Sequence, residues 1–414
     1  MYFRCSFAFE IRKYAFQTLI EAEFRVPSKD VESTKIAKRI ILSGFDPNVF
    51  DAGQASLVAT TFNPPAGILD QLKYSTEFFD TFNIQCDKMW QMHREMLLKL
   101  EEEKYDIIMS EQLNLCGVGL QAALKIKTNI WISSCPLDDH MAYILGVPTP
   151  LSYVPAVGEI SVSDQMSLYE RLRNILEFWK NIRSYYYGMH ETDKIYQKYF
   201  GSSFPSVIEL ARNSALTFVL ADEFLDFPRP ILHSTIYVGG LGLDTTVKPT
   251  LSNEYELEMK KGQKGVIFFS FGTNVETTDL PKSFKIHFFE AMKHFQDYHF
   301  IVKFNAKDKD AEMEARKVPN CKLVDWAPQP AILAHNRLSL FITHGGYNSL
   351  LESVNYAKPL LLMPIFGDQW RNAMLAQRNG FGLVFEKRHL LLSSVEFVNV
   401  LNEMLTNSRS WRFP

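Results

Sequence analysis

The chain has 414 residues, which exceeds the size of one ordinary hydrophobic core and indicates two domains. Apolar residues make up 46% of the chain and charged residues 22%, which is the balance of a folded globular protein and excludes a disordered one. A formal net charge of -3 gives no basic surface for nucleic acid, so we expect no nucleic-acid partner.

The cysteines and the hydropathy pattern suggest few constraints on the fold. The five cysteines are odd in number and contain no CxxC pair, so the sequence indicates neither a zinc site nor a disulfide framework. Charged residues interrupt the N-terminal segment, and no run of about 18 apolar residues occurs, so we expect no signal peptide and no transmembrane helix. Taken as written, the chain is expected to be soluble.

In the first half, short β-branched and aromatic runs alternate with longer helical patterns, which is typical of α/β layers over parallel sheets. The runs at 105–110, 129–134 and 216–220 predict strands. A helix is predicted over Gln112–Lys125, and a long amphipathic stretch runs from Asp164 to Tyr187.

The second half repeats this rhythm, with predicted strands at 265–271, 298–304, 321–325, 338–344 and 359–364. Two successive α/β series predict two doubly wound domains. Prolines and glycines cluster at 226–244, which marks the joint between them. We therefore expect one domain over residues 1–235 and a second over residues 236–414.

The strand predicted at 338–344 ends in an unusually polar junction. It stops at His344, and the tight turn at Gly346 leads into a helix that opens with Asn348 and Ser349. Free backbone N–H groups and the positive end of the helix dipole meet at such a junction, which favours an anion. The three polar side chains add donors, and a diphosphate suits the arrangement.

Further polar and aromatic residues near this junction complete a pattern that is typical of a nucleotide-binding site. Glu352 lies one turn along the helix, where a carboxylate can accept hydrogen bonds from ribose hydroxyls. Trp326 follows the strand at 321–325, and an exposed indole can stack on a base for roughly 1–3 kcal/mol. Asp368 and Gln369 follow the strand at 359–364 and offer polar groups to sugar hydroxyls.

The run FITHGGYNSLLESVNYAKPLLLMPIFGDQ, with WAPQ upstream, resembles the signature of the UDP-glycosyltransferase family, which includes the UDP-glucuronosyltransferases. The resemblance extends from about residue 20 to the end of the chain. It implies a GT-B fold, in which two Rossmann-like α/β domains face a cleft. It also implies an inverting transfer without metal or other cofactor, with a UDP-sugar as the co-substrate.

The resemblance assigns a contact to each part of the donor. It implies that Trp326 stacks on uracil and that Gln329 and Glu352 hold the ribose. Asp368 and Gln369 then hold the sugar. The diphosphate is held by His344, Gly346, Asn348 and Ser349, and by the turn with Ser270, Gly272 and Thr273, where the family usually has SLGS. We also consider Lys303, at the end of the strand at 298–304, a candidate for neutralising the diphosphate.

Catalysis by an inverting transferase needs a base that takes the proton of the acceptor hydroxyl, typically worth about 10²- to 10⁴-fold in rate. In the family this base is a histidine after the first strand, paired with an acidic residue. No histidine occurs in residues 1–92. Glu111 stands at the position of the acidic partner, where Asp is commoner, although an ordinary acid at a helix N-terminus explains it as well.

Family members also carry a secretory signal, a closing C-terminal helix and a membrane span. We therefore expect a chain truncated at both ends, without the first strand of the N-terminal acceptor domain and without the final helix and span. Whether this reflects a gene-model fragment or a shortened paralogue is open. The resemblance implies the endoplasmic reticulum membrane, with membrane contact only if the full protein has the span.

The leading hypothesis is transfer of a hexosyl or glucuronosyl group from UDP-glucose or UDP-glucuronate to a small lipophilic hydroxyl acceptor. The alternative is a non-catalytic UDP-sugar-binding protein that lacks the base histidine. An NAD-dependent oxidoreductase is disfavoured, because no GxGxxG with a following acid occurs. Asp308-Lys309-Asp310 mimics a metal-binding DxD motif, but its charged surroundings predict a solvated segment. Gly117 and Gly119 are expected to allow close helix–strand packing.

Overall fold

The computed structural model describes residues 17–22, 37–63, 68–113, 115–241 and 249–406. The chain divides into two compact units. The first comprises Met1–Gln54, Ala66–Ala156 and Arg171–Gly242, and the second comprises Ala55–Pro65, Val157–Glu170 and Leu243–Pro414. Two short segments of the first half of the chain therefore belong to the second unit, which the sequence pattern did not indicate.

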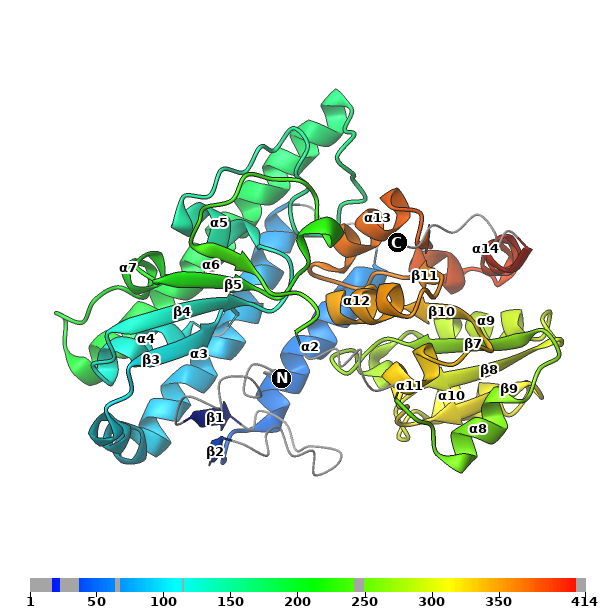
Figure 1. The fold of residues 1–414 in the computed structure, drawn as a ribbon, viewed down its shortest axis with the longest axis horizontal. Helices are drawn as coiled ribbons and strands as arrows, with labels where there is room; N and C mark the ends of the chain where they lie inside the picture. The colour runs from blue at the N-terminus through cyan, green and yellow to red at the C-terminus, as the bar shows by residue number, and fades with distance from the viewer. Residues whose placement is uncertain (1–16, 23–36, 64–67, 114, 242–248, 407–414) are drawn as a thin grey trace. The chain divides into compact units, whose positions relative to one another are not determined.

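The main sheet of the first unit is parallel, with the order β3-β4-β5-β6 (Figure 1). Its strands are β3 (Ile107–Glu111), β4 (Thr128–Ser133), β5 (Leu216–Val219) and β6 (Thr235–Tyr237). A separate parallel pair consists of β1 (Thr18–Ala22) and β2 (Lys38–Leu42). The strands β3 to β5 match the predicted runs, but β6 lies within the segment predicted as the joint. Because β6 pairs with β5, a boundary between residues 235 and 236 would divide a strand of this sheet.

The helices of the first unit pack closely on its sheet. They are α3 (Ile68–Leu98), α4 (Cys116–Ala123), α5 (Asp139–Leu145), α6 (Leu168–Phe200) and α7 (Val207–Arg212), with short 3-10 turns η1 (Lys99–Glu103) and η2 (Glu223–Leu225). A Cβ atom on Gly117 would lie 3.4 Å from Cβ of Ser110 on β3, and one on Gly119 would overlap the ring of Tyr196 on α6 at 2.2 Å. The close helix–strand packing expected of these glycines is confirmed for Gly117, whereas Gly119 packs against a neighbouring helix and not against a strand.

The second unit contains a six-stranded parallel sheet in the order β12-β11-β10-β7-β8-β9 (Figure 1). Its strands are β7 (Gly265–Ser270), β8 (Tyr298–Lys303), β9 (Cys321–Val324), β10 (Leu338–Thr343), β11 (Leu360–Leu362) and β12 (Gly382–Val384). All except β12 were predicted. The direction in which strands are added reverses between β7 and β10, and such a switch point opens a crevice at the carboxyl ends of the two strands.

A phenylalanine-rich core packs this sheet against its helices. The helices are α8 (Asn253–Met259), α9 (Lys282–Met292), α10 (Lys309–Ala315), α11 (Gln329–Leu333), α12 (Tyr347–Asn355), α13 (Gln369–Arg378) and α14 (Val395–Thr406), with η3 (Thr277–Asp279) and η4 (Lys387–Leu391). Phe269 on β7 and Phe284 and Phe288 on α9 belong to the core. Phe62, the last residue of α2 (Pro47–Phe62), joins it with a ring centroid 5.6 Å from that of Phe284. This contact explains why residues 55–65 belong to the second unit.

Both units are parallel α/β layers, as the alternating pattern of the sequence predicts. Within the described part of the chain, no helix is both long enough and apolar enough to cross a membrane.

Candidate functional site

The turns after β7 and β10 meet at the switch point of the second sheet. β7 ends at Ser270 and β10 ends just before His344, and the two strands are hydrogen-bonded neighbours. Gly272 has φ +73°, and a Cβ atom there would lie 2.8 Å from Cε1 of His344. A Cβ atom on Gly346 would lie 2.6 Å from Nε2 of the same ring. Only glycine therefore allows both backbone segments to approach the imidazole.

His344 is buried and uncharged at neutral pH. Its side chain has little solvent contact, and Nδ1 lies 3.3 Å from Oγ1 of Thr343. Burial, and then the charge of Lys303, lower the pKa of His344 to about 4. A neutral imidazole carries one N–H donor, so this ring can donate to an anion without bringing a charge of its own.

Lys303 links the switch point to an aromatic ring. It ends β8, and its Nζ donates to the carbonyl oxygen of Gly272 at 2.8 Å. The same Nζ lies 4.7 Å from the centroid of the Trp326 ring, within the range of a cation–π contact. Burial lowers the pKa of Lys303, while the carboxylates of Asp325 and Glu276 act in the opposite direction. Trp326 keeps 45% of its surface exposed, so the indole remains available to a ligand.

The start of α12 and the start of α11 are joined by a polar network. Nε2 of Gln329 donates to Oε2 of Glu352 at 2.8 Å and to Oγ of Ser349 at 3.1 Å. Burial raises the pKa of Glu352, and the hydrogen bond from Gln329 opposes this rise. Asn348 is exposed in the first turn of α12. The two residues assigned to the ribose therefore hold one another in place.

The loop after β11 is held by residues of α13. Oε1 of Gln369 accepts hydrogen bonds from the backbone N–H groups of Ile365 and Phe366 at 2.8 and 3.1 Å. Asp368 accepts a hydrogen bond from Nδ2 of Asn372 at 2.7 Å, and Nδ2 of Asn372 also donates to the carbonyl oxygen of Gly345 at 3.1 Å. Sequence reasoning missed Asn372, because its role is to join two turns that only the fold brings together.

The structure thus brings the predicted donor-binding residues to one edge of one sheet, since each ends a strand, follows the carboxyl end of a strand or lies in the helix that comes next. They are Ser270, Gly272, Thr273, Trp326, Gln329, His344, Gly346, Asn348, Ser349, Glu352, Asp368 and Gln369. Thr273 is exposed, whereas Ser270 is buried and its Oγ accepts a hydrogen bond from the N–H of Gly272 at 3.2 Å. Their assignment to a nucleotide-sugar stays a prediction.

The DxD-like segment is not wholly solvated as predicted. Asp308 has 3% of its surface exposed and accepts a hydrogen bond from Nζ of Lys285 at 2.9 Å. Its carboxylate also accepts from the N–H of Ala311 and thereby begins α10. Asp310 pairs with Lys282 at the surface, at 3.1 Å. Among the described residues, no group of three or more His, Cys, Asp and Glu side chains gathers in a way that could hold a metal ion.

In the first unit, Glu111 ends β3 and is half-buried. Its carboxylate accepts hydrogen bonds from the N–H of Leu113 at 2.7 Å and from Oγ of Ser134 at 2.9 Å. These contacts hold the acid at the carboxyl edge of the sheet. His140 on α5 is fully buried and stacks on Tyr185 with ring centroids 3.4 Å apart, so it is a core histidine. The predicted pairing of Glu111 with a base histidine stays a prediction.

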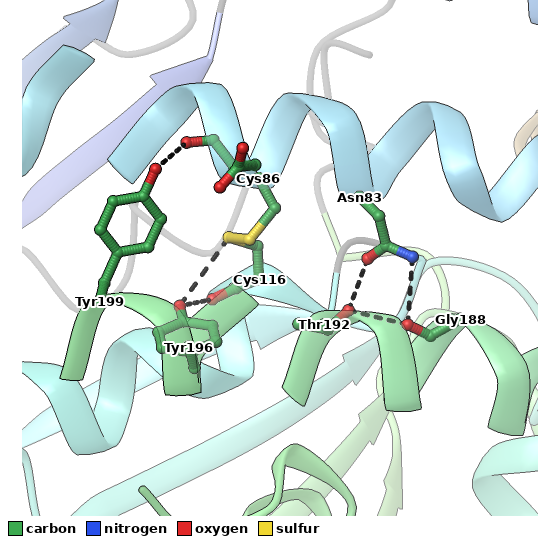
Figure 2. The surroundings of a disulfide bond; sticks show 8 residues. Asn83, Cys86, Cys116, Gly188, Thr192, Tyr196 and Tyr199 are labelled. Atoms are coloured by element: carbon green, nitrogen blue, oxygen red, sulfur yellow. Dashed lines mark hydrogen bonds between the residues drawn. A yellow bond between two sulfur atoms is a disulfide. The ribbon is translucent and has the colours of Figure 1, made fainter. Parts of the chain in front are cut away.

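A disulfide joins Cys86 on α3 to Cys116 at the start of α4, the helix that follows β3 (Figure 2). The sequence had indicated no disulfide, and that expectation is wrong, because a pairing across 30 residues depends on the fold and not on local spacing. The hydroxyl of Tyr196 donates to the carbonyl oxygen of Cys116. Asn83, one turn before Cys86, donates to the carbonyl oxygen of Gly188 and accepts from Thr192, both on α6 (Figure 2).

Comparisons with known proteins show which family the chain is similar to. The family model described as "UDP-glucoronosyl and UDP-glucosyl transferase" matches residues 32–411. The Caenorhabditis elegans protein ugt-47, named as a putative UDP-glucuronosyltransferase, is 34% identical over 94% of this chain and 72% of its own length. Human UDP-glucuronosyltransferase 3A2 is 29% identical over 74% of this chain and 57% of its own length.

Solved structures show the same fold. A structure of Medicago truncatula UGT71G1 complexed with UDP-glucose has a TM-score of 0.62 at 17% identity, covering 97% of this chain and 86% of that one. A structure of a variant of Os79 from O. sativa in complex with UDP has a TM-score of 0.58 at 14% identity, covering 96% and 86%. The predicted GT-B fold is confirmed. The family model and the relatives together define a glycosyltransferase enzyme. The chain belongs to the family of UDP-glucuronosyl and UDP-glucosyl transferases.

Proposed function

We propose that this enzyme transfers a glucosyl or glucuronosyl group from UDP-glucose or UDP-glucuronate to a hydroxyl of a small lipophilic acceptor, with inversion and without a metal ion. The main support is the switch point of the second sheet, where two glycine turns enclose the buried, neutral His344 beside Lys303. The names of the relatives, and the UDP-glucose in the Medicago structure, support a UDP-sugar as donor.

The diphosphate would lie against the start of α12 and the turn after β7. Backbone N–H groups and the helix dipole favour an anion there. His344 would donate one neutral hydrogen bond, and Asn348 and Ser349 would add side-chain donors. Lys303 supplies the positive charge that a metal ion supplies elsewhere, and a bound anion would raise the pKa that burial lowers.

The nucleoside would extend from this point toward Trp326. The indole is half-exposed and lies beside the ammonium group of Lys303, so a stacked uracil would be close to the charge that holds the diphosphate. Glu352 would accept hydrogen bonds from ribose hydroxyls while Gln329 keeps its carboxylate oriented. On the other side of the diphosphate, Asp368 and Gln369 would contact the hydroxyls of the sugar.

The transfer itself is a single displacement. The acceptor oxygen attacks the anomeric carbon while a base removes its proton, and the bond from that carbon to the phosphate oxygen breaks, so that its electron pair leaves with UDP. We propose Glu111 as the acidic group that stabilises the protonated base. Its two hydrogen bonds to the loops after β3 and β4 support this role, because they fix the direction of the carboxylate.

We also propose that the protein folds in an oxidising compartment, as a member of the endoplasmic reticulum system would. The disulfide Cys86–Cys116 supports this location, because such bonds persist in secretory compartments and are rare in the cytosol.

The test is calorimetric titration of UDP and of UDP-glucose into the full chain, with and without EDTA. We expect binding that EDTA does not change. Trp326→Ala should weaken UDP by about 1–3 kcal/mol, because it removes the stacking surface. Asp368→Ala should leave UDP affinity unchanged and weaken only the binding of UDP-glucose, since the sugar is the only part of the donor that its carboxylate would contact.

Transfer to a phenolic acceptor, measured with both UDP-sugars, separates the enzyme from a binding protein. Glu111→Gln should slow transfer without changing UDP affinity. Binding of the donor without transfer to any hydroxyl acceptor would instead favour a non-catalytic UDP-sugar-binding protein. A strict requirement for Mg²⁺ or Mn²⁺ would contradict the metal-independent mechanism.

A further inference from the structure

A buried lysine lies between two aromatic rings in the second unit. Lys387, at the start of η4, has 1% of its surface exposed. Its Nζ lies 5.4 Å from the ring centroid of Trp370 on α13 and 5.7 Å from that of Phe62 at the end of α2. Both distances are within the range of a cation–π contact. These three residues are referred to below as the lysine cage.

The positive charge in the lysine cage lowers the stability of the fold. Burial lowers the pKa of Lys387 from its ordinary 10.5 to about 8. The carboxylates of Glu159 and Glu386 oppose this shift, and the guanidinium group of Arg388 adds to it. From α2 and α13 the ammonium group faces aromatic rings. Because the unfolded chain keeps this proton to higher pH, the charge lowers the free energy of unfolding at neutral pH, and this loss disappears as the pH rises from about 8 to 10.5.

A lysine is therefore not the residue that packing alone would favour in the cage. A methionine of similar length would fill the space between the two rings without bringing a charge out of water. A charge that the fold keeps although it lowers stability is typical of a functional site. The position of the cage indicates which function the charge serves.

One ring of the lysine cage belongs to the part of α13 that borders the donor site. Trp370 directly follows Asp368 and Gln369, the two residues proposed to hold the sugar. Oε1 of Gln369 accepts hydrogen bonds from two N–H groups of the loop after β11. Nδ2 of Asn372 joins Asp368 to the carbonyl oxygen of Gly345. The first turn of α13 thus carries both the residues on the sugar side and the ring that the ammonium group contacts.

We propose that Lys387 is a positioning residue for the sugar end of the donor site. Its ammonium group fixes the indole of Trp370 and thereby the first turn of α13, so that Asp368 and Gln369 keep the direction in which they contact the sugar. The inference rests on the proposed function, because it needs these two residues to bind the sugar. Lys387 is buried and does not touch the donor, and the binding of UDP, which has no sugar, should depend little on it.

The test is calorimetric titration of UDP and of UDP-glucose into the full chain at pH 7 and pH 9, on either side of the pKa of Lys387. The readout is the ratio of the two affinities, because this ratio isolates the contribution of the sugar. At pH 7, Lys387→Met should lower the preference for UDP-glucose over UDP by about three- to fivefold, the effect of losing one cation–π contact. The unmodified chain should lose a similar preference between pH 7 and pH 9, beyond any change that Lys387→Met shows over the same range.

Lys264→Met is the matched control, because Lys264 is an exposed lysine of the same unit whose Nζ pairs with Asp297 at 2.8 Å. This variant should show the affinities and the pH dependence of the unmodified chain. Urea denaturation at pH 7 separates positioning from packing. Lys387→Met should unfold at the same or a higher urea concentration than the unmodified chain, since it no longer buries a charge.

An unchanged affinity ratio in Lys387→Met would overturn the proposal, and a lower urea midpoint in that variant would then assign the cage a purely structural role. The same pH dependence in Lys387→Met and in the unmodified chain would overturn it as well. This second comparison needs no stable variant to fail, because the unmodified chain reports the loss of the charge by itself. If the unmodified chain does not bind UDP-glucose at all, the proposed function fails, and the role of Lys387 fails with it.

Discussion

The two units differ in how the surroundings of their functional edges are held. In the second unit the network at the switch point joins residues that are close in sequence, since Gln329 lies 23 residues from Glu352 and 20 from Ser349. In the first unit the contacts of Glu111 are equally local, at 2 and 23 residues, but the helices beside it are joined over long separations. Tyr196 reaches Cys116 across 80 residues, and Thr192 reaches Asn83 across 109. A site built from neighbouring turns is visible in a sequence, whereas one held by distant contacts is not.

The two units also differ in what stabilises the packing of helix on sheet. The second unit surrounds a phenylalanine-rich core and buries one lysine–aspartate pair beside it. The first unit cross-links two helices with a disulfide. A buried ion pair stabilises the folded state, whereas a disulfide restricts the unfolded chain. Substitutions at the two places should therefore change the free energy of unfolding in ways that can be told apart.

The largest effect is expected at the buried pair of the second unit. Asp308→Ala leaves the ammonium group of Lys285 buried without its carboxylate and removes the first hydrogen bond of α10. We expect the free energy of unfolding to fall by about 3–5 kcal/mol, measured by urea denaturation. Asp310→Ala is the matched control in the same motif, and the loss of its exposed partner should cost at most about 1 kcal/mol. Equal costs for the two variants would contradict the different burial of the two aspartates.

A smaller effect is expected from the cross-link of the first unit. Cys116→Ser should lower the free energy of unfolding by about 2–4 kcal/mol, because the unfolded chain gains the freedom of the opened loop. The measurement is thermal denaturation with and without a reductant. The reductant should shift the unmodified chain toward the variant and leave the variant unchanged.

The paired variant provides the control for this second prediction. Cys86→Ser and Cys86→Ser/Cys116→Ser should cost about as much as Cys116→Ser alone, because all three remove the same bond. Additive costs would mean that the cysteines contribute separately through packing and that the cross-link contributes little.

Much of the second unit could be predicted from the sequence, for a physical reason. Its buried parallel strands are continuous apolar runs, and the residues of the switch-point edge follow those runs directly. Finding the end of each run in the sequence therefore also finds the candidate site residues. Lys303 could be named as a candidate because it ends such a run. Its contact with Trp326, and the joining of two turns by Asn372, could not, because neither residue type nor spacing indicates which loops meet.

The failures have equally specific causes. Asp308 was placed in a solvated segment because its neighbours Lys309 and Asp310 are charged, and only the fold shows that the first turn of α10 directs it toward Lys285. The strand β6 was hidden by the prolines and glycines on both sides of it. The cysteine pair gave no signal, since two cysteines 30 residues apart fit many folds in which they never meet.

The smallest expected effect, taken per pH unit, concerns the protonation of His344 at the switch-point edge. Its pKa is about 4 in the folded state, below the unfolded value near 6.5, because burial and Lys303 disfavour the imidazolium. The neutral ring therefore contributes stability that is fully present above about pH 6.5 and is lost as the pH falls toward 4, since the unfolded chain binds the proton first. One such proton gives a slope of at most about 1.4 kcal/mol per pH unit in this window.

His344→Gln should reduce the slope of the unfolding free energy between those pH values, measured by urea denaturation at several pH values. His294→Gln, at an exposed position in the same unit, should not change it. A bound diphosphate would stabilise the imidazolium, so UDP should also reduce the slope in the unmodified chain but not in His344→Gln. If UDP leaves the slope of the unmodified chain unchanged while it binds, His344 does not contact the diphosphate, and the two glycine turns enclose a histidine whose role is structural.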